Sequence, residues 1–269
     1  MNEDYRAFFG LTKEPYRCDL SPEEIMETEG LAAVTKRFNY ALRLGGVAVV
    51  TGEIGSGKST ALRYAMSRLH PSAYQPLYVT STTGSILELY RQIVADLGLN
   101  LSSNSKAVMT QAVKKEIIQL VEEKKIRPVL VLDEASLLRL EVFQELHTLC
   151  QFHKDSKPYL TLILSGQTLL ADKMVYRTSE PLASRVITRT HLEGIKLEGM
   201  REYLRHHAEI AGLANSPFDE NAVTAIHQGS GGLLRKANHL ARGALIAAAS
   251  DKAQTVNADH VQLASTELF

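Results

Sequence analysis

The stretch Gly52-Glu53-Ile54-Gly55-Ser56-Gly57-Lys58-Ser59-Thr60 decides the fold that we predict for this chain of 269 residues. Its first eight residues fit the pattern G-x-x-x-x-G-K-[ST], whose glycines let backbone N–H groups turn towards a polyphosphate. The apolar run 46–50 before it predicts a buried strand, and residues 60–69 after it predict a helix. The loop therefore lies at a strand-to-helix junction, where the helix N-terminus adds a partial positive charge. Residues 52–60 are thus predicted to bind a nucleoside triphosphate.

Two side chains at the end of this loop have defined chemistry. Lys58 can reach the β- and γ-phosphates, and Ser59 can supply a hydroxyl ligand to Mg²⁺. The alternative is a glycine-rich turn that fits the pattern by chance. The strand before the loop and the helix after it favour the phosphate-binding interpretation, because the motif requires that context.

Further along the chain, an apolar run ends in two carboxylates. Residues 128–132 predict a fully buried, central parallel strand, and Asp133 and Glu134 follow it directly. Asp133 can coordinate Mg²⁺ through water beside Ser59, and Glu134 can orient or deprotonate an attacking water. The alternative is a pair of acidic residues in an ordinary turn.

Strands that alternate with helices predict a parallel α/β sheet, whose carboxyl edge lines the ligand crevice. Residues 160–164 form another buried apolar run, and the polar residues Ser165 and Gln167 come at its end. Either side chain can hydrogen-bond the γ-phosphate or the attacking water, or can simply end the strand. These two interpretations stay open at the level of sequence.

An arginine lies in the segment 181–189, which predicts a short helix that leads into a final edge strand. Arg185 is placed where it can reach a nucleotide held by a neighbouring subunit, as an arginine finger in trans. The alternative is an arginine in a surface ion pair.

After Gly194 the apolar runs of strand type stop, and only helical patterns follow. The predicted helices are 197–212, 219–228, 233–250 and 257–268. We therefore expect an α/β core over residues 1–193 and a small helical domain over 194–269. Arg235 lies at the start of the third of these helices and can point back at the phosphates. His206 and His207 have no partners at metal-ligand spacing, so we expect them at the surface or in packing.

Composition limits the partners and the compartment. Thirty Lys and Arg balance thirty Asp and Glu, so a monomer is not expected to bind DNA strongly through net charge, although a local basic face or an oligomer still can. The basic pairs 114–115 and 124–125 are either a solvated face or phosphate contacts. Two cysteines far apart indicate reduced thiols in a cytoplasmic protein. Every apolar stretch is too short to span a bilayer.

The N-terminal segment contains aromatic residues and prolines before the first long helix. Tyr5, Phe8, Phe9, Pro15 and Tyr16 either form a wall against a purine base or pack as a strap on the core.

Taken together, these motifs resemble those of an AAA+ ATPase over nearly the whole chain. The order is a Walker A loop at 52–59, a Walker B strand at 129–134, a sensor-1 strand end, an arginine-finger region and a sensor-2 arginine in a helical lid. The N-terminal aromatics, the strand end 164–167 and the segment 231–238 resemble one branch in particular. This branch contains the general secretion pathway A-type ATPases and the ATPases encoded beside DDE transposases. Ser165 departs from the family, where asparagine or threonine is common, so the sensor role could pass to Gln167.

The resemblance implies a function as well as a fold. It implies ATP and Mg²⁺ as ligands, a homo-oligomeric ring or filament with ATP at subunit interfaces, and an N-terminal strap closing over adenine through Phe9, Pro15 and Tyr16. It favours an ATPase that assembles on duplex DNA and regulates a transposase in target selection. The alternatives are an ATPase of a secretion or envelope-assembly system and a nucleotide-dependent switch. Secretion members of the branch typically continue into a membrane span, and we expect none here.

Overall fold

The computed structural model describes residues 4–266, which fall into two compact units. The sheet unit consists of Ala32–Gly52 and Lys58–Leu192. The helical unit consists of Glu193–Phe269, the N-terminal Met1–Leu31 and the short segment Glu53–Gly57. The two ends of the phosphate loop therefore belong to the sheet unit, and its middle belongs to the helical unit.

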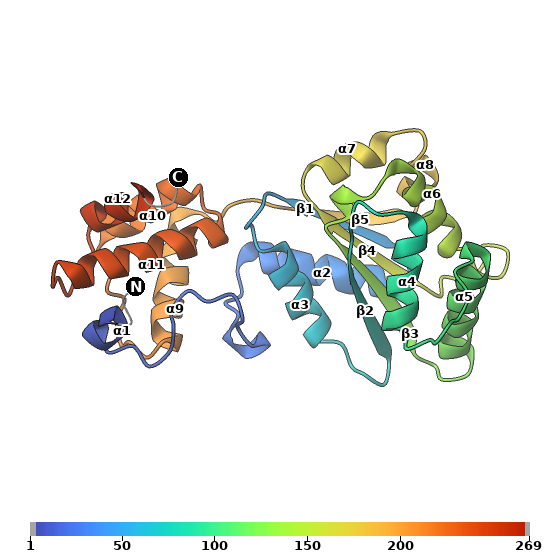
Figure 1. Ribbon diagram of the computed structural model, residues 1–269, viewed down its shortest axis with the longest axis horizontal. Helices are drawn as coiled ribbons and strands as arrows, with labels where there is room; N and C mark the ends of the chain where they lie inside the picture. The colour runs from blue at the N-terminus through green and yellow to red at the C-terminus, as the bar shows by residue number, and fades with distance from the viewer. Residues whose placement is uncertain (1–3, 267–269) are drawn as a thin grey trace. The chain divides into compact units, whose positions relative to one another are not determined.

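The sheet unit is built on five parallel strands in the order β2-β3-β4-β1-β5 (Figure 1). The strands are β1 (Val47–Gly52), β2 (Tyr74–Thr80), β3 (Arg127–Asp133), β4 (Thr161–Gly166) and β5 (Val186–Leu192). The three interior strands are buried along almost their whole length. Their sequences are continuous apolar runs because a strand covered on both faces has no solvent-facing side. The prediction of a parallel α/β sheet is confirmed.

Helices cover both faces of this sheet. α3 (Lys58–Ser67) lies against β1 and β4, whereas α4 (Ile86–Asp96) and α5 (Lys106–Glu122) lie against β2 and β3. The other helices of the sheet unit are α2 (Glu29–Leu44, from Ala32 onward), η2 (Ala135–Leu137), α6 (Leu140–Leu149), α7 (Leu169–Val175) and α8 (Glu180–Ala183). The apolar core between sheet and helices fixes the strand ends, and so the residues that follow them.

The edge strand β2 carries two features that block further strand pairing. Pro76 has no backbone N–H, and the N–H of Tyr78 donates to Asp96 Oδ2 on α4 at 2.7 Å. Proline is tolerated in a strand mainly at such an edge, because an interior strand needs every N–H.

The helical unit contains α9 (Leu197–Ile210), α10 (Glu220–Ser230), α11 (Leu234–Ser250) and α12 (Ala258–Thr266). α11 lies against α10 and α12, and their apolar faces share one core. The described parts of all four agree with the predicted helices, although Leu268 at the end of the last prediction lies outside the described residues. The expected fold, a sheet core followed by a small helical domain, is confirmed.

The N-terminal segment belongs to this helical core. It forms α1 (Asp4–Phe9) and the short turn η1 (Pro22–Glu24), neither of which the sequence predicted. The Tyr16 side chain is only 1% exposed, stacks on the His207 ring with centroids 5.3 Å apart, and donates its hydroxyl to Leu204 O. The buried ring therefore has no face open to a purine base, and of the two interpretations the structure agrees with packing on a core, which here is the core of the helical unit.

The contact-based boundary differs from the expected division at 193/194 mainly because Met1–Leu31 groups with the helices. Between residues 4 and 266, no helix combines the length and apolarity needed to cross a bilayer.

Candidate functional site

Parallel strands bring the predicted site residues to one edge of the sheet. The register pairs Thr51 of β1 with Gly166 of β4, and Leu132 of β3 with Leu164. The last residues of these strands, including Asp133 and Ser165, therefore lie side by side at the carboxyl edge. Such an edge is where open α/β sheets bind ligands.

The loop between β1 and α3 has the backbone that its glycines allow. Gly55 and Gly57 have φ angles of +84° and +98°, which L side chains rarely adopt. The Lys58 side chain is only 6% exposed, and its ammonium donates to Gly52 O at 2.9 Å. The amine is thus folded back over the loop, in position to meet an anion there.

Ser59 and Asp133 are brought into direct contact, as the sequence predicted. The Ser59 hydroxyl donates to Asp133 Oδ2 at 2.7 Å, and Asp133 Oδ1 accepts from the N–H of Glu134 at 2.9 Å. Burial alone would raise the pKa of Asp133, but hydrogen bonds from Tyr78, Ser59 and the Glu134 backbone outweigh it and hold the pKa below its usual range. Asp133 is therefore a carboxylate at neutral pH.

Glu134 stands at a backbone position that is uncommon for its type. Its φ and ψ are 54° and 31°, in the left-handed region, and it begins the turn η2. The Lys173 ammonium donates to Ser136 O and Leu138 O at 2.6 and 2.7 Å, which holds this turn. Left-handed non-glycine residues persist only where the surroundings fix them, and they concentrate at functional sites.

The strand end at Ser165 and Gln167 packs closely on the same turn. A Cβ at Gly166 would lie 2.8 Å from the Ser136 nitrogen, and the Gln167 N–H donates to Ser136 Oγ at 3.3 Å. Ser165 is fully buried, and its hydroxyl also lowers the pKa of Asp133. Yet no hydrogen bond from that hydroxyl meets ordinary geometry within the described residues.

Two buried hydroxyls, those of Ser165 and Ser81, lie close to Asp133. Besides Ser165, the Ser81 side chain is buried without a hydrogen-bond partner among the described residues, next to the backbone bond from Ser81 N to Asp133 O. Within residues 4–266, no three His, Cys, Asp or Glu side chains form a complete metal site. Magnesium characteristically takes one or two protein oxygens and completes its shell with water and phosphates. Ser59 and Asp133 are such oxygens, so the residues present fit Mg²⁺ bound together with a nucleotide.

Arg235 meets the middle of the loop through its backbone. The Arg235 N–H donates to Gly55 O at 3.1 Å, and a Cβ at Gly55 would lie 2.8 Å from Arg235 Cβ. Glycine at 55 is therefore required both by its φ angle and by the close approach of α11. The described contact places the start of α11, with its exposed arginine side chain, beside the loop.

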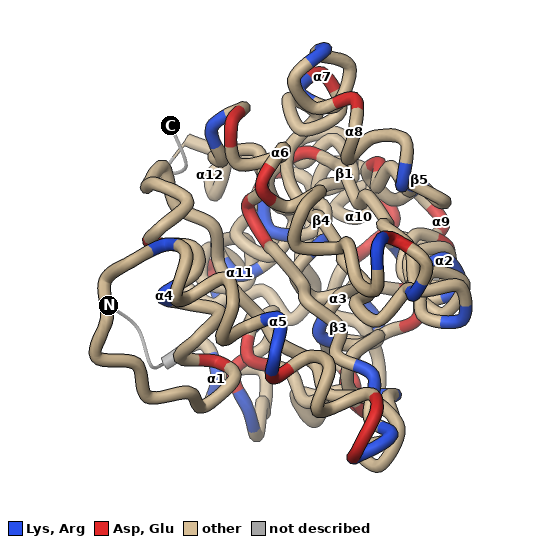
Figure 2. Tube along the Cα trace, turned by 90° about the vertical axis from the view of Figure 1, so that its right-hand side faces the viewer, with Lys and Arg blue, Asp and Glu red and all other residues tan. Residues whose placement is uncertain are grey.

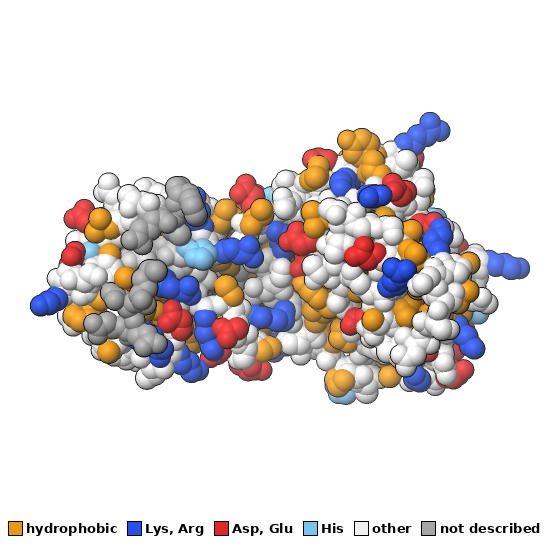
Figure 3. Space-filling model, in the orientation of Figure 1, with side chains coloured by type: hydrophobic (Ala, Val, Ile, Leu, Met, Phe, Trp, Pro, Cys, Tyr) orange, Lys and Arg blue, Asp and Glu red, His pale blue; other side chains and the backbone are white. Residues whose placement is uncertain are grey.

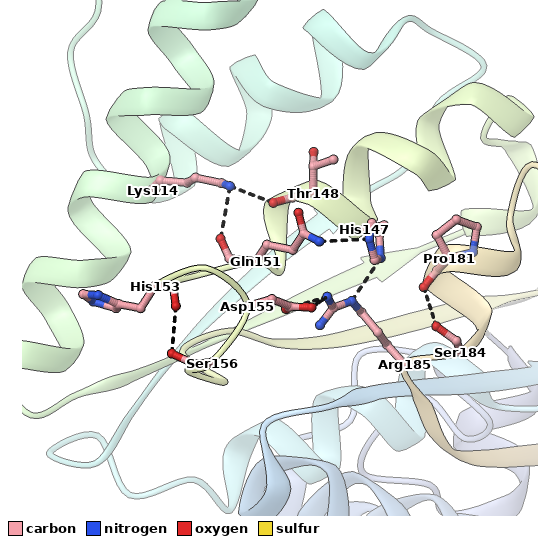
Figure 4. Close-up of polar contacts among 10 residues, drawn as sticks. All are labelled: Lys114, His147, Thr148, Gln151, His153, Asp155, Ser156, Pro181, Ser184 and Arg185. Carbon is pink, nitrogen blue, oxygen red and sulfur yellow. Dashed lines mark hydrogen bonds and ion pairs between the residues drawn. The ribbon is translucent and has the colours of Figure 1, made fainter.

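Arg185 lies at the amino-terminal ends of the strands, whereas the phosphate loop lies at their carboxyl ends. Its carbonyl accepts from the N–H of Val47, the first residue of β1, whereas the loop follows Gly52 at the far end of that strand. The length of the strand separates the two by roughly 17 Å. The guanidinium points at Asp155 and His147 (Figure 4): it donates to both Asp155 oxygens at 2.6 Å and to His147 Nδ1 at 3.0 Å. In the single chain, the arginine is therefore held by its own unit.

The segment that carries Asp155 is strained. His153, Lys154 and Asp155 have φ angles of 47°, 57° and 67°, three successive non-glycine residues in the left-handed region. Each such residue costs about 1–2 kcal/mol relative to the right-handed form. The Ser156 hydroxyl closes the turn on His153 O at 2.7 Å, and His153 contacts Glu122 on α5. The Arg185–Asp155 ion pair thus holds one side of a tight turn.

The lysine pairs are mostly engaged in local contacts. Lys114 donates to Thr148 O and Gln151 O at the end of α6 (Figure 4), Lys124 pairs with Glu116, and Lys125 donates to Glu122 O. Basic and acidic segments are both scattered along the trace in Figure 2, and both signs are intermixed on the face of the sheet unit in Figure 3. These lysines are therefore weaker candidates for phosphate contacts than their charge suggested.

Sequence reasoning missed three residues near these sites. Tyr78 donates its hydroxyl to Asp133 at 2.5 Å, and Asp155 and His147 bind Arg185. Only the strand register and the sheet order bring these residues to their partners, so the chain itself carries no local signal for them.

Comparison with known proteins gives a family and several relatives. The family model described as "AAA domain" matches residues 42–174. The chain is 26% identical over 266 residues to General secretion pathway protein A of Aeromonas hydrophila, covering 98% of this chain and 48% of that protein. It thus spans about half the length of that relative. It is also 26% identical over 251 residues to ATP-dependent target DNA activator B of Escherichia phage Mu, covering 92% of this chain and 74% of that protein.

Solved structures share the fold. The ORC2 protein of Aeropyrum pernix, solved as ADPNP-ADP complexes, has a TM-score of 0.70 at 18% identity and covers 94% of this chain and 71% of its own. The ORC1 protein of the same organism, solved in complex with DNA, has a TM-score of 0.71 at 18% identity. The alignment covers 94% of this chain and 68% of the ORC1 chain. At this level of identity, the likeness establishes the fold alone.

Proposed function

We propose that the chain binds ATP and hydrolyses it with Mg²⁺, on the premise that residues 42–174 match the model of the AAA domain family that the sequence resembles. The observation that carries the proposal is the contact between Ser59 and Asp133, which joins the phosphate loop to the end of β3. Hydroxyl and carboxylate oxygens at this junction are the ligands that a Mg²⁺–nucleotide complex needs.

The proposed chemistry assigns one task to each residue. The N–H groups of residues 52–60 and the α3 N-terminus bind the phosphates, and Lys58 releases Gly52 O to reach the β- and γ-phosphates. Ser59 and Asp133 would hold Mg²⁺, Asp133 through water, and the bound metal would supply positive charge to the phosphate oxygens. Glu134 orients the attacking water and takes its proton. Ser165 or Gln167 hydrogen-bonds the γ-phosphate or that water, and Arg235 contacts the phosphates from the start of α11.

Arg185 is proposed to act on the nucleotide of a neighbouring subunit. Its place at the far edge of the sheet removes it from the loop of its own chain, so only a second copy can use it there. The proposal therefore requires a homo-oligomer, a ring or a filament, in which Arg185 leaves Asp155 for a γ-phosphate. Loss of that phosphate on hydrolysis would then weaken the subunit interface.

The biological role that we propose is assembly on duplex DNA in the cytoplasm and recruitment of a transposase to a target. It is supported by the likeness to the phage target DNA activators, whose name states an ATP-dependent action on target DNA. The second candidate is an ATPase of a secretion or envelope-assembly system that does not bind DNA. It is supported by General secretion pathway protein A, which is as identical to this chain, at 26%, as the phage activators are. The two differ in a testable property, which is nucleotide-dependent DNA binding.

The experiment is co-sedimentation of the purified chain with random-sequence duplex DNA, with and without a slowly hydrolysed ATP analogue and across a salt series. We expect large assemblies that carry DNA down only with the analogue and at lower salt, because phosphate contacts weaken steeply with salt. Lys58→Ala, which lacks the phosphate contact, is the matched control. A nucleotide-bound chain that leaves DNA in the supernatant at every salt concentration would reject the transposition role and favour the secretion role.

A further inference from the structure

Tyr78 makes a contact with the Walker B carboxylate that no motif accounts for. Its hydroxyl donates to Asp133 Oδ2 at 2.5 Å, and the same oxygen accepts from Ser59 Oγ at 2.7 Å. Asp133 Oδ1 is engaged by the Glu134 N–H at 2.9 Å. Three donors from three elements thus fix both oxygens of one carboxylate, and Tyr78 is the donor that comes from the edge strand.

Tyr78 is itself held in place by a backbone hydrogen bond and by its two buried neighbours. Its backbone N–H donates to Asp96 Oδ2 on α4 at 2.7 Å, and its neighbours Leu77 and Val79 are buried in the core on the opposite side of β2. Thr80 is paired with Asp133 in the strand register, so Tyr78 lies two residues earlier on the same face. At that diagonal spacing, a long aromatic side chain reaches its neighbour on the next strand. The hydroxyl therefore arrives at Asp133 through rigid elements.

We propose that Tyr78 is a positioning residue for the Mg²⁺ site, holding the Asp133 carboxylate in the orientation in which it and Ser59 receive the cation. The proposal rests on the ATPase function proposed above. Outer partners that orient metal-binding side chains typically change metal affinity 10- to 100-fold when they are removed. Tyr78 is 37% exposed, so water can replace part of its hydrogen bond and the lower end of that range applies.

The test is Tyr78→Phe, which keeps the ring and removes the hydroxyl. Equilibrium binding of a fluorescent ATP analogue is titrated with Mg²⁺, and binding without metal is measured in parallel. We expect the Mg²⁺ midpoint to rise about tenfold, while metal-free nucleotide affinity and the thermal midpoint stay at wild-type values. Tyr74→Phe, on the same strand, is the matched control and should leave the Mg²⁺ midpoint unchanged.

The outcomes separate this proposal from the function on which it rests. If the wild-type chain binds the analogue with a measurable Mg²⁺ midpoint and Tyr78→Phe shares it, the positioning role is overturned and the ATPase site stands. An equal loss of nucleotide affinity with and without metal also overturns it, because the ring would then support the fold rather than the cation. A wild-type chain that shows no Mg²⁺-dependent binding would overturn both.

Discussion

Replacing Asp155 by asparagine should lower the protein concentration at which the chain assembles with ATP. Arg185 donates to both oxygens of Asp155 at 2.6 Å, and the arginine side chain is 23% exposed whereas the carboxylate is 46% exposed. The Arg185 contact also holds the pKa of Asp155 below its usual range. An arginine that is released from this pair is free to contact a γ-phosphate of the next subunit.

The size of the effect follows from the exposure of the pair. Solvent-exposed ion pairs shift an equilibrium by at most about fivefold, and this pair lies at the upper end, because Arg185 Nη2 contacts both carboxylate oxygens and the arginine side chain is largely covered. When only a fraction of the chains is competent to bind a partner, the apparent affinity equals the intrinsic affinity multiplied by that fraction. We therefore expect Asp155→Asn to lower the midpoint of assembly about threefold to fivefold. Asparagine tolerates the left-handed backbone at 155, so the turn should survive.

Sedimentation velocity and ATP turnover against protein concentration give this midpoint. Asp172→Asn, on the exposed face of α7, makes the same change of charge and should leave the midpoint unchanged. The reasoning is refuted if Asp155→Asn assembles only at the wild-type concentration or above it. His147→Phe removes the other Arg185 partner and should shift the midpoint in the same direction by less, since an imidazole nitrogen carries no negative charge to attract the guanidinium.

Four further results are expected. Lys58→Ala should weaken binding of an ATP analogue at least tenfold, about the effect of losing a charged hydrogen bond, and undiminished binding in equilibrium dialysis would contradict the loop assignment. Glu134→Gln should bind ATP and trap the assembled state. It should cut phosphate release at least a hundredfold, about the contribution of a general base. Turnover at the wild-type rate would show that Glu134 has another role. Arg185→Ala should abolish turnover while leaving nucleotide binding by the single chain intact, and full turnover would discard the trans contact. The pKa of His207 is lowered to about 3 by burial, with His206 adding to the effect and Glu24 opposing it. As pH falls below about 6.5, the histidine therefore takes up a proton in the unfolded chain before it does so in the folded chain. Stability should therefore drop by about 2 kcal/mol between pH 8 and pH 5, and urea unfolding of His207→Phe, which cannot take up that proton, should show a correspondingly smaller drop.

The sequence predicted most of the fold because its signals are local. The glycine pattern at 52–59 and the apolar runs before Asp133 and Ser165 are each readable within a few residues, and each lies where it was expected. Pairwise contacts such as Ser59 with Asp133 were also predictable, since parallel strands send their carboxyl ends to one edge.

What the sequence did not reveal depends on register and on distant packing. Tyr78 meets Asp133 only because β2 pairs with β3 at that offset, and Asp155 meets Arg185 across 30 residues. The surface on which Tyr16 packs could not be predicted, because an aromatic residue buries equally well against any apolar surface. In this chain that surface is the core of the helical unit. Local patterns specify elements, whereas the partners of a side chain are specified by the assembled sheet.

The closed edge at β2 bears on how copies of this chain can meet. With no N–H at Pro76 and that of Tyr78 bound by Asp96, the strand offers a poor template for another strand. Copies of this chain held close together therefore cannot readily extend their sheets through the β2 edge, and strand pairing at open edges is a route by which concentrated proteins aggregate. In the proposed assembly, contacts at the β2 edge would be made by side chains rather than by paired backbone, and such contacts can be reversed without unfolding the subunits.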